Sequence, residues 1–230
     1  NFFKKTLCHY ENNPDIAMCC TKYDLINENS EVIGRRPWFE LTNKPEFISP
    51  DRFCAALQTG ENWLSTTTII FQKCLLVNFG GFDPKLLSFC DGYLSRLIAA
   101  SHGFFYIPEI LAAYRHEENS YSKKTTLNKN SNNQILIRIA EKLQVDVGGE
   151  RLFFYLPLLR RRFDFYQANI SMRSKTTDTF SKFPFSESSK SVLYLNKLIF
   201  LVCICLNILR FRPYPFFSLF NNLINKLRHR

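Results

Sequence analysis

The stretch GGFDPKLLSFCDGYLSRLIAASHGFFYIPEILAAYR, from Gly80 to Arg115, constrains the fold more than any other part of this 230-residue chain. Its middle carries apolar residues at helical spacing: Tyr93, Leu94, Leu97 and Ile98. We expect Gly103 to end this helix, because glycine is favoured just past a helix C-terminus. Two short extended segments are expected around Pro108. The stretch therefore predicts a helix that leads into a sheet.

The sequence before this stretch predicts alternating helices and strands. Residues 1–14 are typical of the end of a helix stopped by Asn-Asn-Pro, and residues 15–27 of a strand buried on both faces. Residues 28–40 indicate a turn and a loop, and residues 42–57 lead into a short helix. Thr66–Phe71 has the β-branched residues of a strand. This order predicts an α/β fold with a mixed sheet.

The character of the chain changes after Ser122. Residues 123–133 have the composition of a polar linker, and an amphipathic helix follows. Its apolar face is formed by Ile135, Leu136, Ile139 and Leu143. A second helix, expected over residues 150–170, is interrupted at Pro157. We therefore expect three parts: an α/β domain in residues 1–122, a linker with amphipathic helices in residues 123–190, and a basic, apolar tail in residues 191–230.

Charge and cysteine content limit the class of protein. The formal net charge is +10, but residues 1–118 carry 11 Lys/Arg against 14 Asp/Glu, whereas residues 119–230 carry 19 against 6. This distribution is typical of an ordinary domain joined to a basic extension. The eight cysteines include no CxxC pair, so we expect no zinc site. Several lie in apolar runs, which favours a reducing compartment such as the cytosol.

Five motifs in the first half of the chain stand in a characteristic order. They are STTTIIFQK (Ser65–Lys73), GGFD (Gly80–Asp83), a helix with Asp91 at its start, YIPEILAAYR (Tyr106–Arg115) and SYS (Ser120–Ser122). In order and spacing they resemble the C-terminal, acceptor-side half of the catalytic domain of family 2 glycosyltransferases. These enzymes have the GT-A fold and use nucleotide-activated sugars. The resemblance spans roughly residues 1–122 and implies a partial GT-A sheet, followed by a mostly helical extension.

The resemblance assigns the central chemical role to Asp91. Inverting sugar transfer needs a general base, which takes the proton of the acceptor hydroxyl as its oxygen attacks the anomeric carbon. The family places this base at the head of the corresponding helix, where the helix N-terminus favours an ionised carboxylate. The alternative is that Asp91 is only an N-cap. Cys90 stands where the family often has an acid, which removes one neighbouring charge.

Further site residues follow from the same resemblance. On the acceptor side they are Trp63, Gly80, Gly81 and Asp83. The two glycines would let the backbone approach the acceptor, and Trp63 could stack on a sugar ring; an ordinary tight turn and a core aromatic are the alternatives. Arg115 and His116 are candidates for the donor diphosphate, since a guanidinium group suits phosphate oxygens. His116 stands one residue before the usual position of the family's histidine, and no metal ligand is assigned.

The resemblance also implies a part that residues 1–230 do not contain. The family binds the nucleotide on an N-terminal βαβ half and holds Mn²⁺ or Mg²⁺ with an Asp-x-Asp motif, which is absent from this sequence. We expect that half upstream of Asn1, so residues 1–230 alone would be inactive. The predicted function is transfer of a sugar from a nucleotide-sugar donor to a saccharide or lipid-linked acceptor, in cell-surface polysaccharide synthesis. The alternative is an inactive remnant that serves as a binding or scaffold module at the membrane.

The end of the chain combines basic and apolar residues. Residues 188–230 include seven Lys/Arg and no acid, around the apolar run Leu198–Leu206. This run is shorter than the ~20 residues that span a bilayer, and the aromatics and arginines suit a helix in the membrane interface. Packing on the protein's own core and insertion of residues 192–209 are the alternatives. We expect a cytoplasmic protein, peripheral at the anionic inner face of the cell membrane, and no nucleic-acid binding.

Replacing Arg210, Arg212, Arg228 and Arg230 with Gln tests the interfacial hypothesis. The unmodified protein should sediment with anionic liposomes at low salt and leave them as salt rises, because salt screens the arginine charges. The variant should stay in the supernatant even at low salt. Sedimentation that resists salt and alkaline wash would indicate a membrane anchor instead, and a complete lack of sedimentation would indicate that the tail packs on its own domain.

Overall fold

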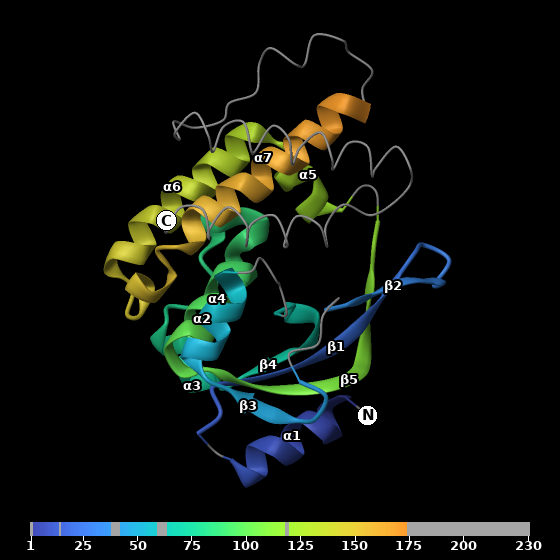
Figure 1. The fold of residues 1–230 in the computed structure, drawn as a ribbon, viewed down its shortest axis with the longest axis vertical. Coiled ribbons are helices and arrows are strands. Elements are labelled where there is room, and N and C mark those ends of the chain that lie inside the picture. Colours follow the sequence, from blue (N-terminus) through green and yellow to red (C-terminus); the bar gives the residue numbers. More distant parts are fainter. Residues whose placement is uncertain (1, 14, 38–41, 59–63, 118–119, 174–230) are drawn as a thin grey trace, which may run out of the picture.

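The computed structural model describes residues 2–13, 15–37, 42–58, 64–117 and 120–173, which form a mixed α/β fold (Figure 1). The helices are α1 Phe2–Asn12, α2 Pro50–Gln58, α3 Lys73–Asn78, α4 Cys90–His102, α5 Tyr121–Leu127, α6 Lys129–Val145 and α7 Tyr155–Arg173. The strands are β1 Met18–Ile26, β2 Val32–Arg36, β3 Glu46–Ile48, β4 Ile69–Phe71 and β5 Phe104–Arg115. Three short 3₁₀ helices are η1 Thr66–Thr68, η2 Pro84–Phe89 and η3 Gly149–Leu152. Among these helices none is both long and apolar enough to cross a bilayer.

The sheet is built around the parallel pair β1 and β5. Their register runs from Cys19 opposite Phe105 to Ile26 opposite Arg115. β4 and β2 pair antiparallel with the other edge of β1, at its start and at its end, and β3 pairs antiparallel with the start of β5. The strand order β2-β1-β5-β3 confirms the predicted mixed sheet.

Helices cover both faces of this sheet, as Figure 1 shows. On one face lies α1, where Tyr10 donates a hydrogen bond to the carbonyl of Ile70 (2.7 Å) and His9 stacks on Phe105. On the other face lie α2 and α4. Every residue of α4 from 93 to 100 is buried, including the four whose spacing predicted the helix. The core is therefore the layer between α4 and the sheet.

The helices after residue 120 pack on this core. The predicted apolar face of α6 is confirmed, since its four residues are all buried. The prediction of a polar linker over residues 123–133 is wrong, because α5 and the start of α6 occupy it and residue 122 lies inside α5. The reason is a helix cap: the side chain of Asn128 accepts hydrogen bonds from the amides of Asn130 (2.9 Å) and Ser131 (3.1 Å).

Two predictions for the first half of the chain are also corrected. Residues 28–40 do not form only a turn and a loop, because β2 pairs with β1 as a hairpin. Thr66–Phe71 is a strand only over β4. Its threonines form η1, in which the Thr68 amide donates to the carbonyl of Ser65 (2.9 Å), so the three threonines belong to a turn rather than to the sheet.

Both prolines that were expected to interrupt elements are accommodated. Pro108 lies within β5, at a register shift where Thr21 pairs with Ile107 but Lys22 pairs with Ile110. A bulge tolerates the missing amide hydrogen of proline, so one strand replaces the two expected segments. Pro157 lies in the first turn of α7, where no intrahelical donor is needed. The second helix therefore begins at Tyr155 and continues through the proline.

Two glycines that both have positive φ allow a test of the α4–β5 connection. Gly103 has φ +72°, and a Cβ there would lie 2.4 Å from the carbonyl oxygen of Ile48; Gly80 has φ +79° with open space around it. Gly80→Ala should cost about 1–2 kcal/mol for the left-handed backbone alone. Gly103→Ala should cost clearly more, above about 3 kcal/mol. Denaturant unfolding of both variants would measure this, and equal losses would contradict the close packing seen at Gly103.

Candidate functional site

Asp91 lies in the first turn of α4, as predicted, and is half-buried. One carboxylate oxygen accepts a hydrogen bond from the hydroxyl of Thr66, and the other accepts from the amide of Gly92 (2.6 Å). The N-cap of α4 is Phe89, so Asp91 is not the N-cap residue, although its carboxylate accepts from the free Gly92 amide of the first turn as a cap would. The carboxylate is held in one orientation by two donors on different segments.

A chain of contacts joins Asp91 to the sheet. Thr66 is the first residue of η1, and Ser65 before it forms a hydrogen bond with the hydroxyl of Tyr23 on β1. The ring of Tyr23 meets that of Tyr114 on β5 edge to face, with ring centres 6.3 Å apart. We call Tyr23, Ser65, Thr66, Asp91 and Tyr114 the Asp91 cluster. It brings together α4, η1 and the carboxyl-terminal halves of the two parallel strands.

Two arginines contribute positive charge to this cluster. Burial raises the pKa of Tyr23, and the hydrogen bond from Ser65 and the charges of Arg36 and Arg162 partly offset that rise. Arg36 lies directly opposite Tyr23 in the β1–β2 register, and Arg162 belongs to α7. Sequence reasoning missed both arginines and the tyrosines, because the pairing of distant strands and the packing of α7 bring them together.

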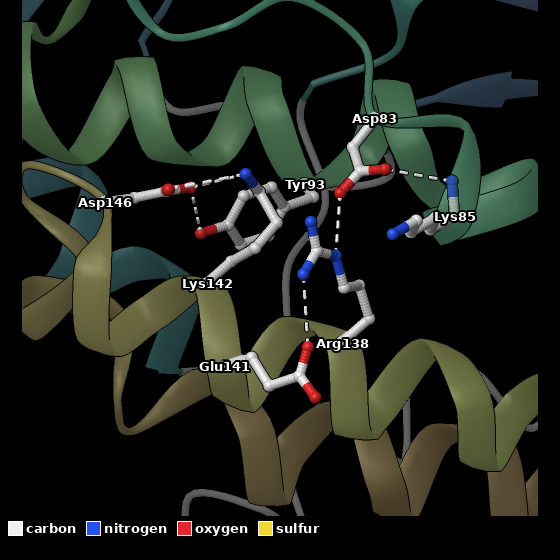
Figure 2. Close-up of polar contacts among 7 residues, drawn as sticks. All are labelled: Asp83, Lys85, Tyr93, Arg138, Glu141, Lys142 and Asp146. Atoms are coloured by element: carbon white, nitrogen blue, oxygen red, sulfur yellow. Dashed lines mark hydrogen bonds and ion pairs between the residues drawn. The ribbon is translucent and has the colours of Figure 1, made fainter.

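Asp83, predicted on the acceptor side, is held by contacts within the protein (Figure 2). Its carboxylate caps η2 by accepting from the Lys85 amide (2.9 Å), and it pairs with the guanidinium of Arg138 on α6 (2.8 Å). Burial raises the pKa of Asp83, but the Lys85 amide and the Arg138 charge outweigh it, so the pKa lies below its usual value. Any contact with an acceptor would have to share this carboxylate with Arg138.

The same face of α6 holds α4 through a second polar group (Figure 2). The hydroxyl of Tyr93 donates to Asp146 (2.9 Å), and Lys142 pairs with the same carboxylate (3.0 Å) while lying over the Tyr93 ring. Burial and the hydrogen bond to Asp146 both raise the pKa of Tyr93, so its hydroxyl remains a donor at neutral pH. These contacts fix α6 on the helix that carries Asp91.

The glycine turn lies after α3. Gly80 and Gly81 both have positive φ, and their amides donate to the carbonyls of Val77 and Leu76 (both 2.9 Å). The tight turn is therefore present, and the space around both glycines is open. Their acceptor role stays a prediction. Trp63, the fourth expected acceptor residue, lies outside the described residues.

Arg115 has a different set of partners from those expected for a diphosphate ligand. Its guanidinium donates to the carbonyls of Asn27 (2.7 Å) and Glu28 (2.8 Å) and to the hydroxyl of Ser30 (3.0 Å), which closes the β1–β2 hairpin. His116 is exposed, and its amide donates to the carbonyl of Ile26 (2.8 Å), which extends the β1–β5 ladder by one bond. These contacts use three of the five N–H donors of the guanidinium, so a diphosphate would have to share Arg115 with the hairpin turn.

The resemblance implies a Mn²⁺ or Mg²⁺ ion, but the part of the chain that the structure describes contains no group of side chains that could bind one. There, no three His, Cys, Asp or Glu side chains are grouped so that they could hold a metal ion. The described residues therefore do not fit that metal, and no chemical step is assigned through it here. The six described cysteines, Cys8, Cys19, Cys20, Cys54, Cys74 and Cys90, are thiols that form no disulfide with one another.

The pairing of Asp83 with Arg138 predicts that the free energy of unfolding depends on pH in the acid range. Because the folded-state pKa of Asp83 is lowered, its contribution is complete above the unfolded-state pKa and is lost as the pH falls through the folded value. Asp83→Asn should lower the free energy of unfolding by about 1–2 kcal/mol at neutral pH. The difference from the unmodified protein should shrink as the pH falls and Asp83 becomes protonated. Arg138→Gln should remove part of the same dependence, whereas a pH-independent difference would contradict the charge pairing.

In the comparisons with known proteins, no family model, no curated protein and no solved structure matches this chain. The functional inference therefore depends on the residues described above. Among them, the Asp91 cluster combines a half-buried carboxylate with hydroxyl groups, aromatic rings and nearby positive charge.

Proposed function

We propose that this chain is the acceptor-side part of an inverting family 2 glycosyltransferase with a partial GT-A fold, in which Asp91 is the general base. One observation carries the proposal: a half-buried carboxylate in the first turn of α4 is oriented by Thr66, and contacts through Ser65 and Tyr23 link it to the carboxyl-terminal halves of two parallel strands. Ligands of open α/β sheets bind at the carboxyl ends of the strands. The motif resemblance, which is independent of this geometry, selects the same residue.

The hydrogen bonds of Asp91 suit a base. Gly92 and Thr66 each occupy one carboxylate oxygen, and each oxygen retains a lone pair that can accept a further proton. In the proposed reaction the acceptor hydroxyl gives its proton to Asp91 while its oxygen forms the new bond to the anomeric carbon. The bond from that carbon to the nucleoside diphosphate breaks, and the diphosphate leaves with the electron pair.

The rest of the Asp91 cluster suits a saccharide. Tyr23 and Tyr114 supply aromatic surface, and Ser65 and Tyr23 supply hydroxyl groups that can bond sugar hydroxyls. Arg36 and Arg162 supply positive charge for an anionic group of the donor or acceptor. Trp63, Gly80, Gly81 and Asp83 remain the proposed acceptor contacts, and Arg115 and His116 the proposed diphosphate contacts.

The proposal includes parts that residues 1–230 do not supply. The nucleotide-sugar donor would bind an N-terminal half that precedes Asn1, together with Mn²⁺ or Mg²⁺. The acceptor would be a saccharide or a lipid-linked sugar used in cell-surface polysaccharide synthesis. The basic tail, residues 191–230, would hold the enzyme at the cytoplasmic face of the membrane by its positive charge.

Asp91→Asn in the whole protein, including the preceding half, tests the proposed base. We expect donor binding to be unchanged and the transfer rate to fall by about 10²- to 10⁴-fold, because the amide cannot accept the proton. Asp51→Asn is the matched control, since Asp51 lies on α2 with its side chain 90% exposed, and transfer should change less than about two-fold. The assay follows label from UDP-, GDP- and dTDP-sugars into saccharide and lipid-linked acceptors, with Mn²⁺ present. Near-normal transfer by Asp91→Asn would refute the assignment.

The same experiment separates the enzyme from the inactive remnant. A remnant would bind no sugar nucleotide and transfer none even as the whole protein. Residues 1–230 alone should show no binding to these donors by calorimetry, because the nucleotide site is proposed to lie upstream. Micromolar binding by residues 1–230 would place a donor site within this chain instead.

A further inference from the structure

Arg96 is a charged residue in the core of the protein. It lies on α4, five residues after Asp91, and only 2% of its surface is exposed. Burying a guanidinium group is costly unless it is well placed among partners. A residue that remains charged in this position is therefore expected to serve a purpose that an apolar side chain would not.

Two contacts of Arg96 lie at the start of α4, and a third lies on α7. Its guanidinium donates a 2.5 Å hydrogen bond to the carbonyl of Gly92, the residue next to Asp91. It also lies over the ring of Phe89, the N-cap of α4, at 5.4 Å, and over the ring of Tyr155 at 5.2 Å. These two rings are nearly parallel, with an interplanar angle of 16°.

Gly92 is closely fitted to this arrangement. A Cβ on Gly92 would lie 3.1 Å from the Phe89 ring and 3.2 Å from the Arg96 guanidinium. The absence of a side chain therefore lets Phe89 and Arg96 approach the turn from the same direction. The amide of the same Gly92 holds one carboxylate oxygen of Asp91.

We propose that Arg96 is the positioning residue of Asp91: it fixes the first turn of α4 through Gly92 and Phe89 and ties that turn to α7 through Tyr155. This inference rests on the proposed function for its catalytic consequence. It adds that the C-terminal helices are part of the active site, since Tyr155 begins α7. A small shift of the base away from the acceptor hydroxyl is enough to slow transfer strongly.

Two substitutions of Arg96 separate positioning from simple packing. Arg96→Met keeps the length of the side chain and loses its charge and its donors, whereas Arg96→Lys keeps a charge and a donor. Replacing buried charge with apolar volume is often neutral or stabilising. If Arg96 only fills space, Met should therefore be tolerated better than Lys. If Arg96 positions the turn, Lys should rescue function and Met should not.

The first readout needs no substrate. Cys90, half-buried beside Asp91, reports on the turn through its rate of alkylation by iodoacetamide, followed by site-resolved mass spectrometry, with the exposed Cys8 and Cys74 as internal references. We expect Arg96→Met to raise the Cys90 rate by about three- to ten-fold, and Arg96→Lys to leave it near the unmodified value. His102→Gln, at an exposed position in the last turn of the same helix, is the control and should not change the rate. An unchanged Cys90 rate in Arg96→Met would overturn the proposal.

The second readout is transfer by the whole protein. We expect Arg96→Met to lower kcat by about 10- to 100-fold with little change in the KM for the sugar nucleotide, and Arg96→Lys to recover most of it. A folded Arg96→Met variant with normal kcat would overturn the positioning role. If the Cys90 rate rises as expected but the unmodified protein transfers no sugar, the proposed function fails while the hold of Arg96 on the turn is supported.

Discussion

The parallel pairing of β1 with β5 is the interaction on which the rest of the structure depends. It joins residues that lie 86 to 89 positions apart in the chain, from Cys19 with Phe105 to Ile26 with Arg115, and each of the other described strands pairs with one of these two. The pairing spans Cys19 to Ile26, so it continues past the bulge at Pro108 to the carboxyl ends of both strands. Parallel strands need a long crossover connection, and the segments that carry the candidate site lie within that crossover.

The pairing also determines where Asp91 lies. α4 leads into β5 through the tight turn at Gly103, so the helix runs back across the sheet against the strand direction. Its 13 residues cover about 20 Å, which carries its first turn toward the carboxyl end of β5. Tyr114 lies at that end, and the Tyr23–Ser65–Thr66 contacts complete the path to Asp91. The carboxylate is therefore placed by the topology of the sheet.

Structural features that depend on a few neighbouring residues were predicted well from the sequence, whereas contacts between distant segments were not. The buried faces of α4 and α6 follow from apolar spacing, and Asp91 at the head of α4 follows from its motif. The edge strand β2 was missed because its exposed residues lack an apolar pattern, and it is defined by pairing with β1. The contacts of the arginines were the hardest to predict from the sequence. Arg115 closes a hairpin and Arg36 faces Tyr23 because of the strand register, which the sequence does not show.

The uneven charge of the chain has a structural consequence in the described region. Ion pairs run from acids of the first half to arginines of the second: Asp83 with Arg138, and Asp51 with Arg151. Each exposed pair contributes little by itself. Both pairs nevertheless stabilise the packing of α6 and η3 against the first half of the chain. Arg138 also holds Asp83 at the start of η2, which leads directly into α4. The described part of the basic extension, residues 120–173, is therefore not an independent appendage, because Arg138 fixes the segment from which the Asp91 helix begins.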